Sequence, residues 1–407
     1  MSGFMDRRSF LAAGLASLAG CAQQQAGTAP AAPAAPAPPY SSADTAGPPV
    51  AFDRAVQIAA DRVLATTPKG AARQTVIIDP LVDGVTGEQS AATQQIQNRI
   101  LEVARANYPQ FEFPPFSAEV VARNPLVMVG TFTPVSVGAP GGAKDAFRFC
   151  LAMGDLQSGR AVAKAVTRAQ FEGVDTTPTP FFRDSPAWTD DALVKSYVTT
   201  CQGTKVGDPI PPAYLRGILT ASMISDAISA YAAGRYAEAL DLYHSAERTQ
   251  AGDQLRVHNG LYLCNWKLGH RAEAERAFGD LVDYSLNNNR LAVKLLFRPG
   301  STGLVGQENG PTEMWLRQIA TRAAARNTCL QVSGHTSRTG SAALNEQLSL
   351  LRAEYVKSRL EEDAPALRGR VIAAGFGSSQ NLVGTGADNA TDALDRRVEF
   401  KVMNACT

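Results

Sequence analysis

One stretch, residues 331–353, constrains the fold of this 407-residue chain more than any other. Its first residues predict a short β-strand, and Gly334 and Gly340 frame a tight loop after it. Beyond the loop, apolar residues recur at the spacing of an α-helix. They predict the inner face of that helix: Leu344, Leu348, Leu351 and Tyr355. The loop side chains and the helix should therefore meet at one strand–loop–helix corner.

The loop and the helix together carry a specific motif. The loop reads Gly-His-Thr-Ser over residues 334–337, and the helix reads Asn-x-x-Leu-Ser-x-x-Arg-Ala over residues 345–353. This closely resembles the signature of the OmpA-like peptidoglycan-binding domain, whose loop reads Gly-His-Thr-Asp. Later in the chain, Asp-Arg-Arg-Val at residues 395–398 stands where the family has Asn-Arg-Arg-Val. The resemblance predicts a C-terminal βαβαββ domain over residues 290–407.

The resemblance also implies a ligand, the stem peptide of peptidoglycan held through its diaminopimelate. In the family the loop Asp takes the ammonium group of diaminopimelate, and the helix Arg takes its carboxylate. A guanidinium suits that task because it can donate two hydrogen bonds side by side. Arg352 matches the family's arginine. The residues that the resemblance implies for peptidoglycan binding are Ser337, Arg352, Asn345, His335, Thr336 and Arg397.

Ser337 departs from the family in a way that bears on ligand binding. Its hydroxyl has no charge to balance an ammonium, and Arg338 beside it places a like charge nearby. A hydrogen bond to a charged group contributes ~1.5–3 kcal/mol, so losing the charged partner weakens binding about ten- to hundredfold. Two outcomes remain open. Either binding persists through Arg352, Asn345 and the loop backbone, or the domain keeps the fold and has lost or changed its ligand.

Each of these residues also has a purely structural interpretation. Arg352 could be a solvated helix arginine, and Asn345 could brace the loop. His335 fits a hydrogen bond within the loop better than catalysis, because no activated nucleophile stands beside it in the sequence. Arg397 could pair with a neighbouring acid instead of shaping the ligand loop.

Motifs for catalysis, cofactors and metals do not occur in the sequence. Gly-x-Ser-x-Gly, Walker, zinc-protease and Cys-x-x-Cys patterns are absent, and the four histidines are scattered. No enzymatic activity, no cofactor and no metal are therefore expected. A formal net charge of +1 makes no case for a basic face, so no nucleic-acid partner is expected either.

The N-terminus predicts export and lipid attachment. An arginine pair at residues 7–8 precedes an apolar run too short to span a bilayer, and residues 18–21 read Leu-Ala-Gly-Cys. This resembles a bacterial lipobox, which implies a signal peptide over residues 1–21, lipidation of Cys21, including palmitate, and anchoring at the outer membrane facing the periplasm. An ordinary secretory signal remains the alternative. The arginine pair also resembles a twin-arginine signal without excluding general export.

A low-complexity segment follows the signal. Residues 22–50 are almost all Ala, Pro, Gln, Ser, Thr and Gly, a composition that cannot bury enough apolar surface to offset the entropy of ordering. We expect a disordered tether that holds the folded part away from the lipid surface.

Of the six cysteines, one belongs to the lipobox. An oxidising periplasm permits disulfides between the others, although the sequence alone does not fix their connectivity. We expect Cys150 to pair with Cys201 and Cys329 with Cys406, because each pair lies within one predicted domain. Cys264 should then be buried in a helix.

Residues 51–205 predict an α/β domain, because helical patterns alternate with strand-like apolar runs. The helices are expected over residues 52–64 and 91–106, and the strands over residues 74–79, 111–116, 125–132 and 147–153. The contiguous apolar residues of the third strand suit burial on both faces. The arrangement loosely resembles the periplasmic assembly lipoproteins of the CsgG and FlgO kind, which implies a fold and little about activity.

Residues 206–289 predict a short helical repeat. An Ala-rich pattern around Gly234 recurs around Gly269, close to the tetratricopeptide period of ~34 residues, in which each unit is a helical hairpin. Two units alone are only marginally stable, since roughly three are usually needed, so we expect them to pack against a neighbouring domain. The repeat could form a protein-binding groove, or it could be a spacer of packed helices.

These segments together predict a multidomain α+β protein. We expect an outer-membrane lipoprotein that ties the envelope to peptidoglycan without a covalent bond, through its C-terminal domain. The alternative is a periplasmic assembly or secretion adaptor, in which residues 51–289 bind envelope proteins and the C-terminal domain has lost or changed its ligand.

Overall fold

The computed structural model describes residues 47–138, 144–306, 310–384, 386 and 391–406. The predicted signal peptide, the lipidation site at Cys21 and nearly all of the predicted tether lie outside the described residues. Among the described helices, none combines the length and the apolar character that crossing a bilayer needs.

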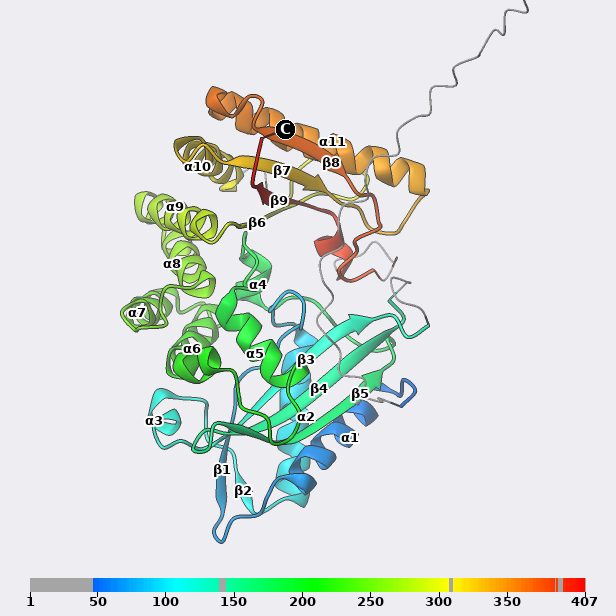
Figure 1. Cartoon of the computed structure of the whole chain (residues 1–407), viewed down its shortest axis with the longest axis vertical. Coiled ribbons are helices and arrows are strands. Elements are labelled where there is room, and N and C mark those ends of the chain that lie inside the picture. Colours follow the sequence, from blue (N-terminus) through cyan, green and yellow to red (C-terminus); the bar gives the residue numbers. More distant parts are fainter. Residues whose placement is uncertain (1–46, 139–143, 307–309, 385, 387–390, 407) are drawn as a thin grey trace, which may run out of the picture. The chain divides into compact units, whose positions relative to one another are not determined.

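The first part of the chain forms a five-stranded mixed sheet (Figure 1). The strand order is β2-β1-β3-β4-β5, in which β1 runs parallel to β2 and β3, whereas β3, β4 and β5 are antiparallel. β3 and β4 are buried over most of their length, in line with the contiguous apolar runs. The strands are β1 (Gln74–Ile78), β2 (Phe111–Glu112), β3 (Leu126–Val135), β4 (Ala146–Asp155) and β5 (Arg160–Ala169).

Helices cover both faces of this sheet. α1 (Phe52–Thr66) and α2 (Ala91–Asn107) pack on one face, and α3 (Ala118–Val121), α5 (Ala192–Gln202) and α6 (Pro212–Ala232) pack on the other. Cys150 on β4 and Cys201 on α5 form a disulfide with their Cα atoms 6.1 Å apart. Two details differ from the sequence analysis. The strand expected over residues 111–116 is only two residues long, and β5, which alternates small apolar with charged residues, was not foreseen.

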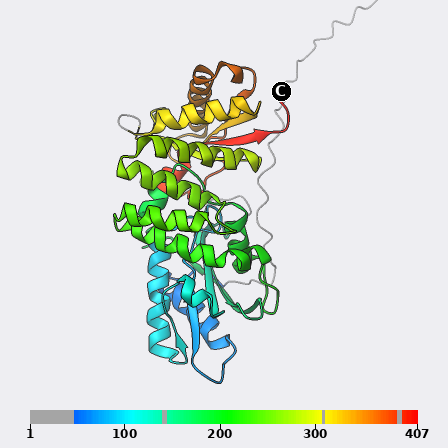
Figure 2. The same cartoon turned by 90° about the vertical axis from the view of Figure 1, so that its left-hand side faces the viewer.

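Helices α6 to α9 form two successive hairpins, each packed on the next (Figure 2). Gly234 and Gly269 follow the first helix of each hairpin with φ angles of 76° and 82°, which a residue with a side chain rarely adopts. This explains why the pattern recurs around these two glycines. The remaining helices here are α4 (Pro180–Asp184), α7 (Tyr236–Glu247), α8 (Leu255–Leu268) and α9 (Arg271–Asn287).

The last part of the chain is a four-stranded sheet with the order β6-β9-β7-β8. β7 and β8 are parallel, and β9 lies antiparallel between β6 and β7. The predicted βαβαββ order and the mixed α+β fold class are confirmed. Cys329 and Cys406 form a second disulfide, and Cys264 is a free, buried thiol. The elements are β6 (Leu291–Leu296), α10 (Thr312–Ala325), β7 (Cys329–Gly334), α11 (Ala342–Asp363), β8 (Val371–Gly375) and β9 (Arg397–Met403), with 3₁₀ turns η1 (Pro365–Leu367) and η2 (Thr391–Asp395).

The inner face of α11 is not the one that its apolar spacing predicted. Leu344 and Leu351 are 65% and 45% exposed. The buried stripe is instead Asn345, Ser349, Arg352, Ala353, Val356 and Leu360. The physical reason is that the polar residues of the motif turn inward, where they hydrogen-bond to the loops beside the helix.

One apolar core runs from the helical hairpins into the C-terminal sheet. A single cluster joins buried apolar residues of the C-terminal half of α6, of α7 to α11 and of the strands β6 to β9, together with Phe181 and Trp188. The core therefore crosses the boundary near residue 290 that the sequence analysis placed between two domains.

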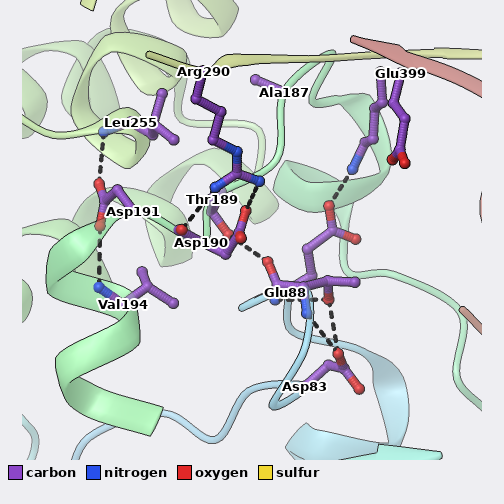
Figure 3. A network of polar contacts seen from close by, with 12 residues as sticks. Asp83, Glu88, Ala187, Thr189, Asp190, Asp191, Val194, Leu255, Arg290 and Glu399 are labelled. Atoms are coloured by element: carbon purple, nitrogen blue, oxygen red, sulfur yellow. Dashed lines mark hydrogen bonds and ion pairs between the residues drawn. The ribbon is translucent and has the colours of Figure 1, made fainter. Parts of the chain in front are cut away.

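Residues 185–191, the connecting segment between α4 and α5, join the parts of the molecule (Figure 3). Backbone hydrogen bonds fasten this segment to β6, including one of 2.8 Å from the Trp188 amide to the Ala292 carbonyl. Asp191 caps the N-terminus of α5 and also accepts a 2.9 Å hydrogen bond from the Leu255 amide at the start of α8.

Two ion pairs reinforce this junction. Arg290 binds both the side chain and the carbonyl of Asp190. Lys294 on β6 binds Glu88 in the loop after β1, and these two side chains are only 1% and 5% exposed. The Lys294 ammonium also lies 4.4 Å from the centre of the Trp188 ring. The first sheet and the C-terminal sheet are thus linked by a buried charge pair.

Candidate functional site

The six side chains that the sequence singled out for ligand binding lie around the C-terminal ends of β7 and β8. His335, Thr336 and Ser337 follow β7, Asn345 and Arg352 belong to α11, and Arg397 opens β9. Hydrogen bonds link them. The His335 amide donates to the Arg397 carbonyl at 2.8 Å, and the Asn345 side chain donates to the Thr339 carbonyl at 3.0 Å. All six are at most 7% exposed, so the structure shows them gathered but covered.

Two glycines explain how α11 comes so close to this corner. A side chain at Gly334 would overlap the backbone oxygen of Ser349, and one at Gly375 would lie 2.6 Å from the amide nitrogen of Leu350. Both strands therefore end in glycine because the helix backbone rests directly on them. The Ser349 hydroxyl fills the remaining space and accepts a 2.9 Å hydrogen bond from the Gly377 amide.

Arg352 is fully buried, with 0% of its surface exposed. Its guanidinium donates from Nη1 to the His335 carbonyl at 3.0 Å, from Nε to the Ser301 carbonyl at 2.9 Å, and from Nη2 to the Arg298 carbonyl at 3.0 Å. The Phe297 ring lies 5.1 Å from its Cζ. Arg352 is thus not a solvated helix arginine but a fixed cation beneath two loops.

Glu399 and Arg397 form an ion pair beside the His335 ring. Its Nε2 lies 3.3 Å from Glu399 Oε1, without the geometry of a hydrogen bond, and Arg397 Nε donates to the other Glu399 oxygen at 3.0 Å. Burial, followed by the nearby Arg397 charge, lowers the pKa of His335. Burial raises the pKa of Glu399, but the nearby Arg397 charge leads the effects that offset this, so that pKa lies below its usual range. A neutral imidazole beside an ion pair is therefore expected at neutral pH.

Asp395 has a structural role that the sequence analysis did not assign. Its carboxylate accepts hydrogen bonds from the amides of Leu382, Val383 and Gly384 at 2.6, 3.1 and 2.7 Å. The neighbouring Asn381 side chain donates to the Thr336 carbonyl at 2.9 Å, so Asp395 indirectly holds the ligand loop as well. The signal available in the sequence was the charged Asp where the resembling family has Asn, because a carboxylate offers more acceptor positions than an amide.

This arrangement suits one half of a zwitterionic ligand better than the other. Arg352 carries a fork of donors of the kind that suits a carboxylate, although backbone carbonyls accept from Nε, Nη1 and Nη2 here. At the other position Ser337 carries no charge, and its hydroxyl lies 2.9 Å from that of Thr339. The adjacent Arg338 is exposed and adds positive charge at the rim of the loop. The charge around this loop therefore favours an anionic group over an ammonium group.

Comparison with known proteins matches residues 296–393 to the OmpA family. The C-terminal part of this chain is an OmpA-family domain. It is 42% identical over 78 residues to outer membrane porin F of Pseudomonas fluorescens, covering 18% of this chain and 22% of that protein. It is 40% identical over 84 residues to outer membrane protein Omp38 of Acinetobacter baumannii, covering 20% of this chain and 22% of that protein. The chain spans about a fifth of the length of these curated relatives.

Two solved structures resemble the OmpA-family domain. The peptidoglycan-associated lipoprotein from Burkholderia pseudomallei is 22% identical, with a TM-score of 0.25, and the match covers 27% of this chain and 89% of that one. The cell wall anchor of the T6SS from Pseudomonas aeruginosa is 24% identical, with a TM-score of 0.24, and the match covers 30% of this chain and 93% of that one.

Proposed function

We propose that the OmpA-family domain binds peptidoglycan without a covalent bond, through the diaminopimelate of its stem peptide. The observation that carries this proposal is the position of Arg352, whose guanidinium is fixed at the base of the loop by the His335 carbonyl. The other side of the guanidinium, formed by Nε and Nη2, donates here to the Ser301 and Arg298 carbonyls, and it is this side that would hold a ligand carboxylate once those carbonyls move away. The names of a peptidoglycan-associated lipoprotein and a cell wall anchor among the similar structures agree with this role.

In this proposal each residue has a separate task. Arg352 grips the diaminopimelate carboxylate, and the Ser337 hydroxyl accepts a hydrogen bond from the ammonium. His335, Thr336 and Asn345 hold the loop, and Arg397 holds Glu399 beneath it. Because Ser337 is uncharged, binding should be weaker than in a domain with Asp at this position, by about ten- to hundredfold.

The remaining segments would place the chain in the cell envelope. Lipidation at Cys21 and the segment 22–50 would anchor the chain at the outer membrane and let the OmpA-family domain reach the wall. Residues 51–289 would then face the periplasm, where they could bind envelope proteins. The role is one of binding, not catalysis.

Co-sedimentation of the detergent-solubilised full chain with purified peptidoglycan tests the binding site. Arg352→Lys keeps the charge but loses the two-donor fork, and we expect at least about tenfold weaker binding. Ser337→Asp restores the missing charge and should strengthen binding about tenfold or more. Arg359→Ala is the matched control, because this arginine is on the same helix but pairs with Glu313 at the surface.

A second candidate function, an assembly or secretion adaptor, is favoured by two observations. Ser337 lacks the charge for the ammonium, and backbone carbonyls already occupy the Nε, Nη1 and Nη2 donors of Arg352. If the wild-type chain and Arg359→Ala stay in the supernatant while Ser337→Asp sediments, the fold can hold the wall but the natural protein does not. The adaptor function would then replace the tether.

A further inference from the structure

A short surface strap covers the arginine of the proposed site. Residues 297–304, here called the strap, join β6 to the segment before α10. A bridge between Phe297 and Leu304 closes the strap into a narrow turn, and the Arg298 amide donates to the Gly303 carbonyl at 3.0 Å within it. The strap thus holds its shape by local contacts.

The strap occupies the binding edge of Arg352. Nε and Nη2 form the side of a guanidinium that can hold two oxygens of one carboxylate in parallel. Here Nε donates to the Ser301 carbonyl at 2.9 Å and Nη2 donates to the Arg298 carbonyl at 3.0 Å. Two carbonyl oxygens of the strap therefore stand where the two oxygens of a ligand carboxylate would stand.

Two buried residues, Phe297 and Leu304, anchor the ends of the strap, and most residues between them are exposed. Arg298, Pro299, Gly300 and Thr302 are exposed, and Leu304, at 2% exposure, anchors its far end. Gly300 has a φ of 60°, so the turn depends on a residue without a side chain. Segments with this combination of exposed backbone and sparse apolar anchoring open locally at a small fraction of the cost of global unfolding.

We propose that the strap is an autoinhibitory lid, displaced when a ligand carboxylate takes over Nε and Nη2 of Arg352. This inference rests on the proposed function, because it concerns access to the same site. The exchange conserves hydrogen bonds, since each carbonyl is replaced by a carboxylate oxygen and then becomes free to bind water. The closed strap lowers the apparent affinity in proportion to the fraction of molecules that are open. The His335 carbonyl keeps its hydrogen bond with Nη1 throughout and holds the guanidinium in place.

Hydrogen exchange on the full chain tests the lid without requiring tight binding. The Arg298 amide bonds within the strap and the Val305 amide bonds across its base to the Leu296 carbonyl. The Phe297 amide, at the buried first residue of the strap, bonds instead to the carbonyl of Arg396 just before β9, and the His335 amide bonds to the carbonyl of Arg397, the first residue of β9. We expect the first pair to exchange at least about tenfold faster than the second. Adding a synthetic stem tripeptide that ends in diaminopimelate should speed exchange in the strap while slowing it at residues 335–339. Equal protection of both pairs without ligand, or slower strap exchange with ligand, overturns the lid.

Binding of the same tripeptide to strap variants tests the lid proposal separately from the proposed binding site. Leu304→Ala removes the buried anchor, and Pro299→Gly loosens the exposed turn without touching the core. Both should bind at least about threefold more tightly than the wild type, whereas Val305→Ala, at a neighbouring residue that is 52% exposed, should match it. Equal or weaker binding by both loosened variants contradicts the lid but leaves the proposed function intact. If the wild type, both variants and Ser337→Asp all fail to bind, the proposed function is wrong, and the lid falls with it.

Discussion

Burial changes the acid–base behaviour of single residues in this protein, and Asp79 is the clearest case. Its side chain lies at the end of β1, is 5% exposed, and accepts a 2.9 Å hydrogen bond from the Tyr214 hydroxyl. Burial raises the pKa of Asp79 from 3.8 to about 6, against the opposing effects of Arg256 and the Tyr214 hydrogen bond. The folded protein should therefore hold a proton that the unfolded chain has already released between these two pH values.

This predicts a pH-dependent contribution to stability with a definite sign. Because the folded pKa lies above the unfolded one, the contribution of Asp79 is fully present below pH 4 and is lost as the pH rises through about 6. Asp79→Asn keeps an acceptor for Tyr214 but cannot titrate. The unfolding free energy of the wild type relative to this variant should fall by about 2 kcal/mol between pH 4 and pH 7.

Urea denaturation of the two proteins across this range measures the difference. Comparing them with each other cancels other groups, including His335, whose lowered pKa acts in the opposite direction by destabilising the fold as the pH falls. Tyr214→Phe adds a control, because it removes the hydrogen bond but keeps the carboxyl group. Parallel curves for the wild type and Asp79→Asn would contradict the assigned pKa shift.

At the scale of elements, α11 places its apolar and polar residues differently from an ordinary amphipathic helix. Val356 is fully buried, whereas Leu351 is 45% exposed. We expect Val356→Ala to lower the unfolding free energy by about 2 kcal/mol, because it removes two buried methyl groups and leaves a cavity. Leu351→Ala should change it by less than about 0.5 kcal/mol.

Thermal unfolding of both variants checks this assignment. A larger loss of stability for Leu351→Ala than for Val356→Ala would mean that the buried face of α11 is the one predicted from the apolar spacing. Replacing Leu351 by Glu gives a sharper comparison, since a charge is tolerated only if the side chain reaches solvent.

The same helix shows what the sequence could and could not predict. Long apolar runs made β3 and β4 predictable, and the spaced motif placed His335 and Arg352 at one corner. The prediction of the inner face of α11 was wrong, because the buried contacts of this helix are largely polar and spacing rules count only apolar residues. The strap could not be foreseen, because Arg298 and Arg352 are far apart in sequence and meet only through a backbone carbonyl.

At the scale of the whole molecule, the OmpA-family domain is not separate from the rest of the chain. The apolar core continues from the helical hairpins into the last sheet, and the connecting segment runs beside β6. Within this junction Glu88 and Lys294 form a pair with little solvent access, and Glu88 Oε2 has no hydrogen-bond partner in the described structure. Burial raises the pKa of Glu88, against the opposing charge of Lys294. The ionisation of the Glu88 carboxylate thus depends strongly on the charge of Lys294.

Removing one member of this pair should cost much more than removing both. Lys294→Ala leaves a buried carboxylate without a partner, and we expect the unfolding free energy to fall by about 3–5 kcal/mol. The double variant Glu88→Gln, Lys294→Met removes both charges and should retain most of the stability, because no uncompensated charge remains. Arg235→Ala, which breaks an exposed pair with Glu238, serves as the control and should have little effect. Calorimetry of the wild type and the three variants measures these differences in unfolding free energy. Equal losses for the single and double variants would mean that the contact stabilises the junction only by packing, and that the charges do not couple the first sheet to the OmpA-family domain.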